Sequence, residues 1–181
     1  MLIKRKIDFI EVLKNWGIGE ANSPEFGTPA NSAILREGLK NNNFYYLKPL
    51  LSKRPQFITY LYNLNLKWSY IPFNFIFENF NKISTLNNND WHVVTNGTFK
   101  IIDALNYYLN SKDENRVKSI LKNFSQLTKE DFSGIIIIKR NPRNYMIYEG
   151  HARLIAIYKL HYEKANLDFL KAITIIIGLP T

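Results

Sequence analysis

The clearest pattern of apolar positions lies in the last third of the chain and predicts two strands, a helix and a further strand. A run of isoleucines fills Gly134–Lys139, and Tyr145–Tyr148 is apolar or aromatic, which is typical of short buried strands. Between Leu154 and Leu160, apolar side chains recur at helical spacing and fall on one side of the predicted helix. Isoleucines at alternate positions within Lys171–Ile177 predict a final buried strand.

The chain before this segment predicts mainly helices. Apolar spacing predicts them over five ranges: Ile7–Trp16, Ser32–Lys40, Arg54–Leu64, Thr98–Leu109 and Val117–Phe124. Leu127–Phe132 predicts a turn or short helix, capped by Thr128 with Asp131 three residues later. Aromatic residues are dense between Phe44 and Phe80, and we interpret them as packing residues, with base stacking as the alternative. We therefore expect a mostly helical, aromatic-rich part over residues 1–130, packed on a core motif at 131–181, in one compact domain overall.

Two segments predict loops. The first predicted helix stops at Gly17, and Gly17–Pro29 is rich in turn-forming residues, so we expect an irregular loop that either lines the site or only connects elements. Its glycines follow no strand and the chain has no GxxxxGK[ST] motif, so a P-loop is not supported. Asn87–Asp90 predicts a second loop, and Trp91–Val94 after it is ambiguous.

Charge points to an anionic partner. The 181-residue chain has a formal net charge of +9 and a pI near 9.6, which favours nucleic acid or phosphorylated small molecules as ligands. The basic residues are dispersed, without a block of five or six like charges, so a basic nucleic-acid-binding tail is not supported.

Composition excludes several classes of protein. The chain contains no cysteine, which removes disulfides, thiol catalysis and iron–sulfur clusters. It shows no secretory signal and no apolar run near the roughly 20 residues that span a bilayer, so we expect a cytoplasmic location and no membrane partner. His92 and His161 lack partners at ligand spacing, and we predict no transition-metal site.

The most informative stretch is the turn Tyr148-Glu149-Gly150-His151-Ala152-Arg153-Leu154. Gly150 lies between a predicted strand and a predicted helix, and His151 and Arg153 fall in the first helical turn. The first N–H groups of a helix lack intrahelical acceptors and favour anions, so this junction predicts a phosphate site. The alternative is that Gly150 only makes the turn.

This turn and its surroundings resemble the ParB/sulfiredoxin-like superfamily. The residues that carry the resemblance run from about Ile135 to Ile177, and Ala152 stands where members commonly have a second histidine. The resemblance implies an α+β fold, with a small mixed sheet and helices in the C-terminal third. Sulfiredoxin activity needs a cysteine and is excluded. Only a few tens of residues follow Arg153, so we expect no downstream helix-turn-helix for DNA.

The branch that fits best is similar to the free-serine kinases. It implies an ATP- and Mg²⁺-dependent small-molecule kinase or related phosphotransferase, acting on a nucleotide and a small hydroxyl-bearing substrate. Backbone N–H groups from Gly150 to Ala152 would hold phosphate, and Arg153 would bind its oxygens. His151 would hydrogen-bond phosphate or transfer a proton. Glu149 would bind Mg²⁺ or take the proton of the attacking hydroxyl.

Alternatives remain open for the residues and for the protein. Arg153 would otherwise form a salt bridge, His151 would cap the helix, and Glu149 would complement the helix dipole. Lys139, Arg140 and Arg143 are interpreted as a solvated basic face. Two other functions are weighed: a nucleic-acid-binding or nuclease-like protein, motivated by the charge and the aromatics, and a non-catalytic partner-binding protein, motivated by Ala152.

Overall fold

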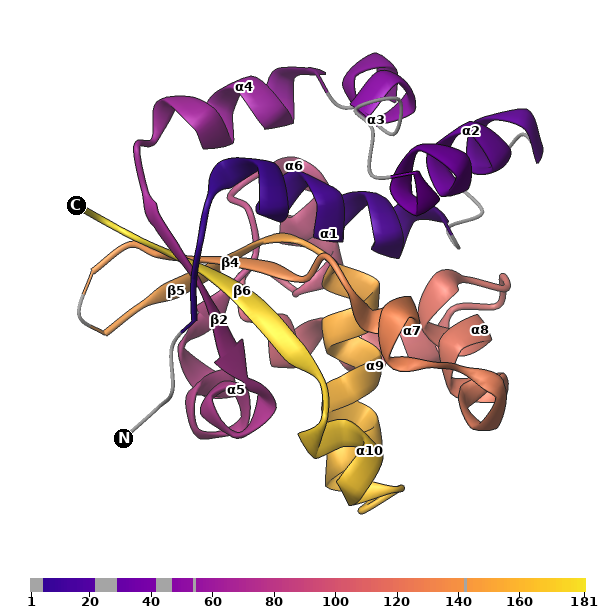
Figure 1. Cartoon of the computed structure of the whole chain (residues 1–181). Helices are drawn as coiled ribbons and strands as arrows, with labels where there is room; N and C mark the ends of the chain where they lie inside the picture. Colours follow the sequence, from indigo (N-terminus) through magenta and orange to yellow (C-terminus); the bar gives the residue numbers. More distant parts are fainter. Residues whose placement is uncertain (1–4, 22–28, 42–46, 54, 142) are drawn as a thin grey trace.

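One mixed sheet runs through the middle of the molecule, with helices on both of its faces (Figure 1). The structure is a computed structural model, and it describes residues 5–21, 29–41, 47–53, 55–141 and 143–181. Six strands pair in the order β1-β2-β6-β4-β5-β3. Their bounds are β1 Arg5–Ile7, β2 Lys67–Pro72, β3 Ile83–Ser84, β4 Ile136–Lys139, β5 Tyr145–Glu149 and β6 Thr174–Leu179. The α+β class expected from the sequence is therefore confirmed.

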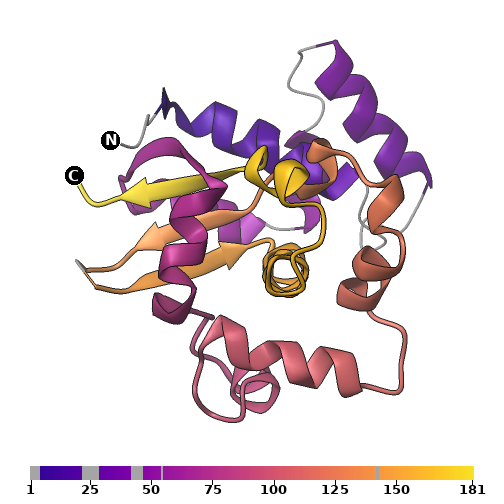
Figure 2. The same ribbon diagram turned by 90° about the horizontal axis from the view of Figure 1, so that it is seen from below.

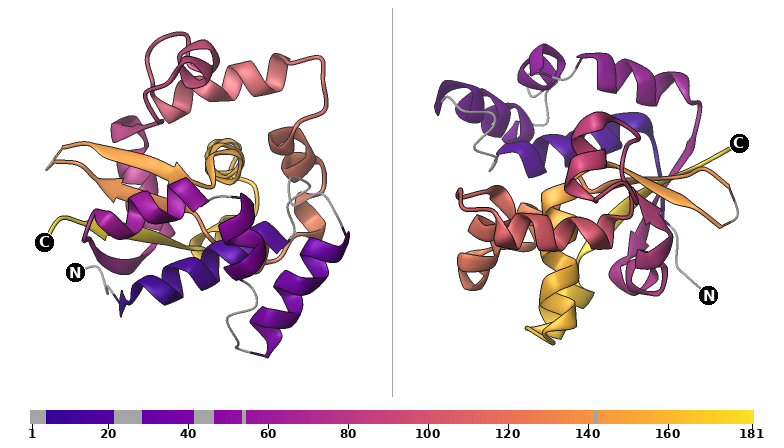
Figure 3. Two further views of the ribbon diagram at one scale, coloured as in Figure 1. Left: turned by 90° about the horizontal axis from the view of Figure 1, so that it is seen from above. Right: turned by 180° about the vertical axis from the view of Figure 1, so that it is seen from behind.

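Two groups of helices cover the sheet, as the views from below, above and behind in Figures 2 and 3 also show. The first group lies on one face: α1 Phe9–Ala21, α2 Pro29–Lys40, α3 Leu47–Lys53 and α4 Pro55–Asn63. The second group contributes to the core of the other face: α5 Phe73–Asn79, α7 Ala104–Asn110, α8 Arg116–Lys122, α9 His151–Tyr162 and α10 Leu167–Lys171. The described residues also form the short helix α6 (Asn89–Val94) and the 3₁₀ turns η3 Phe80–Lys82, η4 Ile101–Asp103, η5 Phe124–Gln126 and η6 Lys129–Phe132.

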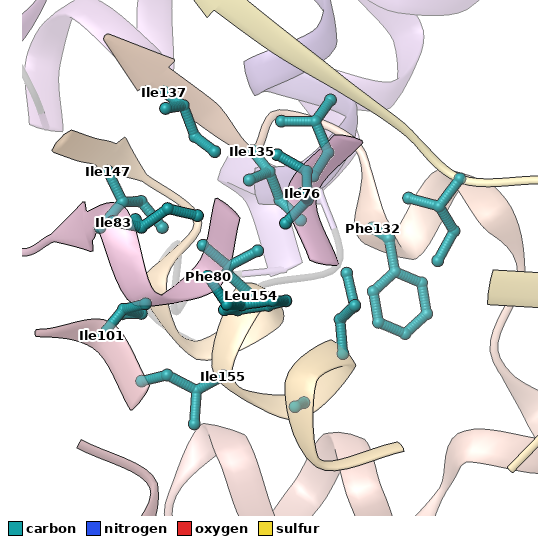
Figure 4. Close-up of a cluster of buried hydrophobic side chains, with 14 of the residues drawn as sticks. Ile76, Phe80, Ile83, Ile101, Phe132, Ile135, Ile137, Ile147, Leu154 and Ile155 are labelled. Carbon is teal, nitrogen blue, oxygen red and sulfur yellow. The ribbon is translucent and has the colours of Figure 1, made fainter. Parts of the chain in front are cut away.

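The isoleucine runs exist because the central strands are buried on both faces. In β4, Ile137 packs into the core beside α9, whereas Ile136 and Ile138 pack into the core beside α1 and α4. In β6, Ile177 and Ile176 divide between the two cores in the same way. A strand buried on both faces needs apolar side chains at consecutive positions. Figure 4 shows the larger cluster, in which Ile137 and Ile147 face Leu154 and Phe80.

The two parts of the chain share this sheet. Strands β1, β2 and β3 come from residues before 130, and β2 pairs with β6 along six residues. The N-terminal part is thus mostly helical but also supplies three strands, which the apolar pattern did not predict. Among the described residues, no helix is long and apolar enough to span a bilayer.

Most predicted helices and strands occur close to their expected positions. Helices α2, α4 and α8 and strands β4 and β5 lie within a few residues of the predicted ranges. The predicted cap before η6 is confirmed, since the Asp131 carboxylate accepts from the Thr128 N–H at 2.8 Å. The last strand begins three residues later than predicted, at Thr174, because α10 occupies Leu167–Lys171.

The predicted end of the first helix is wrong. Helix α1 continues through Gly17 and Gly19 to Ala21, and α2 already begins at Pro29. Gly17, Gly19 and Glu20 are buried, so packing against neighbouring segments outweighs the low helix propensity of glycine. The remainder of the predicted loop, residues 22–28, lies outside the described residues.

Two further boundaries differ from prediction. Asn89 and Asp90 belong to α6 rather than to a loop, because the Asn88 side chain accepts from the Trp91 N–H at 3.0 Å and caps the helix. The helix predicted from Thr98 starts only at η4. Phe99 has a left-handed φ of 57° and donates its N–H to Thr95 Oγ1, which holds that segment out of the helix.

Candidate functional site

The junction between β5 and α9 requires a glycine for two reasons. Gly150 has φ 85° and ψ 25°, in the left-handed region that other residues adopt only at a cost. A Cβ atom at this position would lie 3.0 Å from Ile135 Cα and 2.9 Å from Ile135 Cγ1. The Gly150 N–H donates to Glu149 Oε1 at 2.8 Å, so this carboxylate is held beside the start of α9.

A cavity of about 440 Å³ lies at this junction. Its wall includes the predicted turn from Tyr148 to Arg153 and residues from α1, α4, α6, α7 and α8. The other residues that line it are Glu20, Phe57, Leu86, Asn88, Asp90, Trp91, Val94, Tyr108 and Arg116. The volume is within the range of sites for small ligands and cofactors.

Arg153 is buried and bonded to protein oxygens. It is 1% exposed, and its Nη1 donates to the Ser133 carbonyl at 2.5 Å. Its Nη2 lies 3.4 Å from Glu20 Oε1 and 3.5 Å from Glu149 Oε1. The guanidinium therefore joins two carboxylates that are 129 positions apart in the chain (149 − 20).

Helix α1 makes this arrangement possible through Gly19. A Cβ atom on Gly19 would overlap Arg153 Nη1 and the Ser133 carbonyl oxygen. Glu20, the next residue, is 3% exposed, and its Oε2 is buried without a hydrogen-bond partner among the described residues. An unpartnered buried carboxylate oxygen is costly, so this atom favours a donor group of a ligand in the cavity.

His151 packs as a neutral ring against α6. Its imidazole stacks on Trp91 with centroids 4.4 Å apart and an interplanar angle of 22°. Part of the side chain is exposed, but its Nε2 is buried and has no partner within the described part of the chain. Burial, and then the positive charge of Arg153, lower the pKa of His151 to about 3. At neutral pH the ring is uncharged and suits hydrogen bonding to a ligand better than proton transfer.

Arg116 and Asp90 add two more charges to the wall of the cavity. Arg116 is the first residue of α8, and its Nη2 lies 3.5 Å from the Gly19 carbonyl oxygen, so α8 is held next to the end of α1. Asp90 lies in the first turn of α6 and is exposed. The cavity thus combines three carboxylates and two guanidinium groups with aromatic walls, a set that can bind a polar, charged small molecule.

The sequence indicated only the part of this site that lies between β5 and α9. The residues from Glu149 to Arg153 all line the cavity, whereas Lys139, Arg140 and Arg143 lie at the opposite end of β5. Sequence reasoning missed Glu20, Asp90, Trp91 and Arg116. Glu20 lay within a predicted loop, and nothing in local spacing indicates that it pairs with Arg153.

The acidic residues do not form a metal cage by themselves. Among the described residues, no three His, Asp or Glu side chains are placed to hold one ion. Glu149 is the predicted ligand for Mg²⁺, and its Oε1 already accepts from Gly150. Mg²⁺ is commonly held by one or two carboxylates together with substrate phosphates, so the residues present are compatible with an ion that arrives with a nucleotide.

Comparison with known proteins adds no relative. No protein-family model, no curated protein and no solved structure matches this chain.

Proposed function

We propose that the cavity at the start of α9 binds a nucleotide or related phosphate ligand, and that the protein is an ATP- and Mg²⁺-dependent small-molecule kinase or related phosphotransferase. One observation carries the proposal. The left-handed Gly150 starts a twelve-residue helix whose first turn forms a wall of a 440 Å³ cavity lined by both guanidinium and carboxylate groups. A helix start supplies N–H donors and a favourable field for phosphate.

Arg116 is the cation best placed to bind the phosphate groups. Arg153 lies almost completely inside the protein and contacts Ser133, Glu20 and Glu149, so it acts by positioning these groups. Arg116 is only half-buried and lies in the first turn of α8, at the cavity wall. A guanidinium can hold two phosphate oxygens at once.

The carboxylates would serve the metal and the acceptor. Glu149, with 23% of its side chain exposed, is the residue that would hold Mg²⁺ against the phosphates, and Mg²⁺ would offset their charge. In the transfer step, the acceptor hydroxyl oxygen bonds to the terminal phosphorus as the bond from that phosphorus to the bridging oxygen breaks. ADP leaves, and the hydroxyl proton passes to a cavity carboxylate. Glu20 Oε2, buried and unpartnered among the described residues, is available to accept from the acceptor hydroxyl.

Thermal denaturation with nucleotides tests this proposal and its choice of nucleotide. A ligand present at 100 times its Kd stabilises the folded state by about 2.7 kcal/mol, or roughly 5–10 °C in Tm for a domain of this size. We expect such a shift with ATP and Mg²⁺, a smaller one with ATP and a chelator, and transfer of the terminal phosphate to a small alcohol. The absence of a shift with ATP, ADP and CTP would contradict the proposal.

A further inference from the structure

The fold gathers a second group of charges at the end of the sheet away from the cavity. Lys139, Arg140 and Arg143 are close together in the sequence, whereas Lys67 is far from them. We call these four residues the basic sheet end. Lys67 starts β2, Lys139 ends β4, and the two arginines lie in the connection from β4 to β5. The cavity lies beyond the other end of β5, at Glu149.

Strand register places Lys67 and Lys139 on either side of β6. Lys67 pairs with Leu179 of β6, and Ile138 pairs with Gly178, so Lys139 lies next to Leu179 on the other side of β6. Lys67 and Lys139 are therefore two strands apart, about 10 Å at the usual strand spacing. Their neighbours in the strands, Trp68 and Ile138, pack under α1 and α4. Successive side chains of a strand point to opposite faces, so Lys67 and Lys139 point to the face that α9 covers.

Backbone hydrogen bonds join described residues of the connection between β4 and β5. Asn141 Oδ1 accepts from the N–H groups of Arg143 and Asn144 at 3.0 and 2.8 Å, and Arg140 N–H donates to the Asn144 carbonyl. Arg140 and Arg143 are exposed. In the ribbon views of Figures 1, 2 and 3, the joined ends of β4 and β5 extend beyond the helices, beside the end of β6.

The basic sheet end carries more positive than negative charge within the described part of the chain. None of the four residues of the basic sheet end forms an ion pair there. Asp8, the residue after β1, continues the register opposite Lys67, and its carboxylate accepts from the Glu11 N–H at the start of α1. The connection carries asparagine and arginine but no large apolar side chain, which disfavours insertion into a lipid surface.

We propose that the basic sheet end binds double-stranded DNA, with the β4–β5 hairpin in the major groove and its cations on the phosphates. The major groove of B-form DNA admits a two-stranded β-ribbon, whereas that of duplex RNA is too deep and narrow. Arginine on a projecting hairpin can bind phosphate oxygens in pairs, and Lys67 adds a point charge from β2, on the other side of β6. This surface is separate from the cavity and does not depend on the function proposed for it.

Fluorescence anisotropy with a labelled DNA duplex of about 20 base pairs, over roughly 50 to 200 mM salt, tests the proposal. The variant Lys139→Ala/Arg140→Ala/Arg143→Ala should bind at least about tenfold more weakly than the wild type. The slope of log affinity against log salt should fall by about 3, close to one per lost phosphate contact. The variant Arg140→Lys/Arg143→Lys keeps the charges but loses the paired contacts, so its affinity should lie between those of the wild type and the alanine variant, with the salt slope of the wild type.

A matched control separates this surface from net charge. The variant Lys112→Ala/Lys122→Ala/Lys129→Ala removes three exposed cations from the side of α7, α8 and η6, and also lowers the net charge from +9 to +6 (9 − 3). It should change affinity less than twofold. Equal loss in both triple variants, or no binding of the wild type at 50 mM salt, would overturn the proposal. Tighter binding of duplex RNA than of DNA would overturn the groove placement.

Discussion

Arg153 stabilises the fold through a buried ion pair rather than by facing solvent. Its guanidinium lies between Glu20 and Glu149, and Glu20 is itself almost fully buried. Removal of one partner of a buried pair leaves an uncompensated charge, which typically costs about 3–5 kcal/mol. An Arg153 variant that binds no ligand is consequently a poor test of the site, because a loss of folded protein would abolish ligand binding as well.

Arg153→Met should lower the free energy of unfolding by about 3–5 kcal/mol, measured by urea denaturation. The double variant Arg153→Met/Glu20→Gln should recover part of this loss, because the unpaired charge is gone. Lys159→Met is the control on the same helix, since it breaks a partly exposed pair with Glu163 and should cost less than about 1 kcal/mol. A double variant no more stable than Arg153→Met would contradict this account.

His151 makes stability depend on pH in the acid range. An unfolded histidine titrates near pH 6.5, whereas burial and Arg153 lower the pKa of His151 to about 3 in the fold. Between these values the unfolded chain binds a proton that the folded chain does not bind. Stability that is fully present above about pH 6.5 therefore declines as pH falls towards 3, by at most about 1.4 kcal/mol per unit.

His151→Gln should remove this dependence. Between about pH 7 and pH 5 we expect the wild type to lose roughly 1–2 kcal/mol more stability than the variant, as measured by urea denaturation at each pH. His92→Gln changes an exposed histidine of α6 and should follow the wild type. Parallel curves for the wild type and His151→Gln would contradict this account, because they would show that His151 binds a proton equally well in the folded and unfolded states.

At the scale of residues, the sequence predicted the turn but not its partners. The order of Glu149, Gly150, His151 and Arg153 at a strand–helix junction is a local pattern, and the structure places all four at one cavity. The pairing of Arg153 with Glu20 joins segments 133 residues apart. Apolar periodicity and motif spacing carry no information about such a contact.

At the scale of elements, the end of α1 positions one wall of the site. The helix continues past the point where its glycines predicted a stop, because Gly19 lets the Arg153 guanidinium and the Ser133 carbonyl lie against the helix backbone. A glycine in the middle of a helix usually costs about 1 kcal/mol relative to alanine, so Gly19 is retained here for close approach.

The substitution Gly19→Ala should destabilise the protein by at least about 2 kcal/mol, although helix propensity alone predicts a gain of about 1 kcal/mol. Urea denaturation gives the sign of the change in the free energy of unfolding, which decides between destabilisation by steric overlap and the gain that helix propensity predicts. In an Arg153→Met background the cost should shrink, because one of the two overlapping groups is gone. Strict additivity of the two substitutions would contradict the contact.

The sequence predicted those helices and strands whose apolar positions follow one clear period. Strands β4 and β6 are runs of isoleucine and α9 has an apolar side, so local pattern and tertiary burial agree. Strand β2 mixes Trp68, Ser69 and Tyr70 and was not predicted, since its partner β6 lies more than 100 residues later. Helix α6 has no fully buried residue, and only Trp91 and Val94 pack against the core, so its apolar pattern is too short to predict a helix.

At the scale of the molecule, the sheet connects two distinct charged regions. Strand β5 has the cavity at its Glu149 end and the basic sheet end at its Tyr145 end. The sequence indicated a solvated basic face at Lys139, Arg140 and Arg143 but not the contribution of Lys67, which joins them only through the pairing of β2, β6 and β4. The DNA-binding experiment therefore tests a property of the assembled sheet.

The central claim is that the cavity at the start of α9 binds a nucleotide, and calorimetric titration with ATP and Mg²⁺ tests it most directly. We expect one site per chain, with Arg116→Ala weakening binding at least about tenfold, the effect of about 1.4 kcal/mol. Lys122→Ala removes a cation from the same helix outside the cavity and should stay within about twofold of the wild type. No heat of binding, or equal weakening by both substitutions, would contradict the claim.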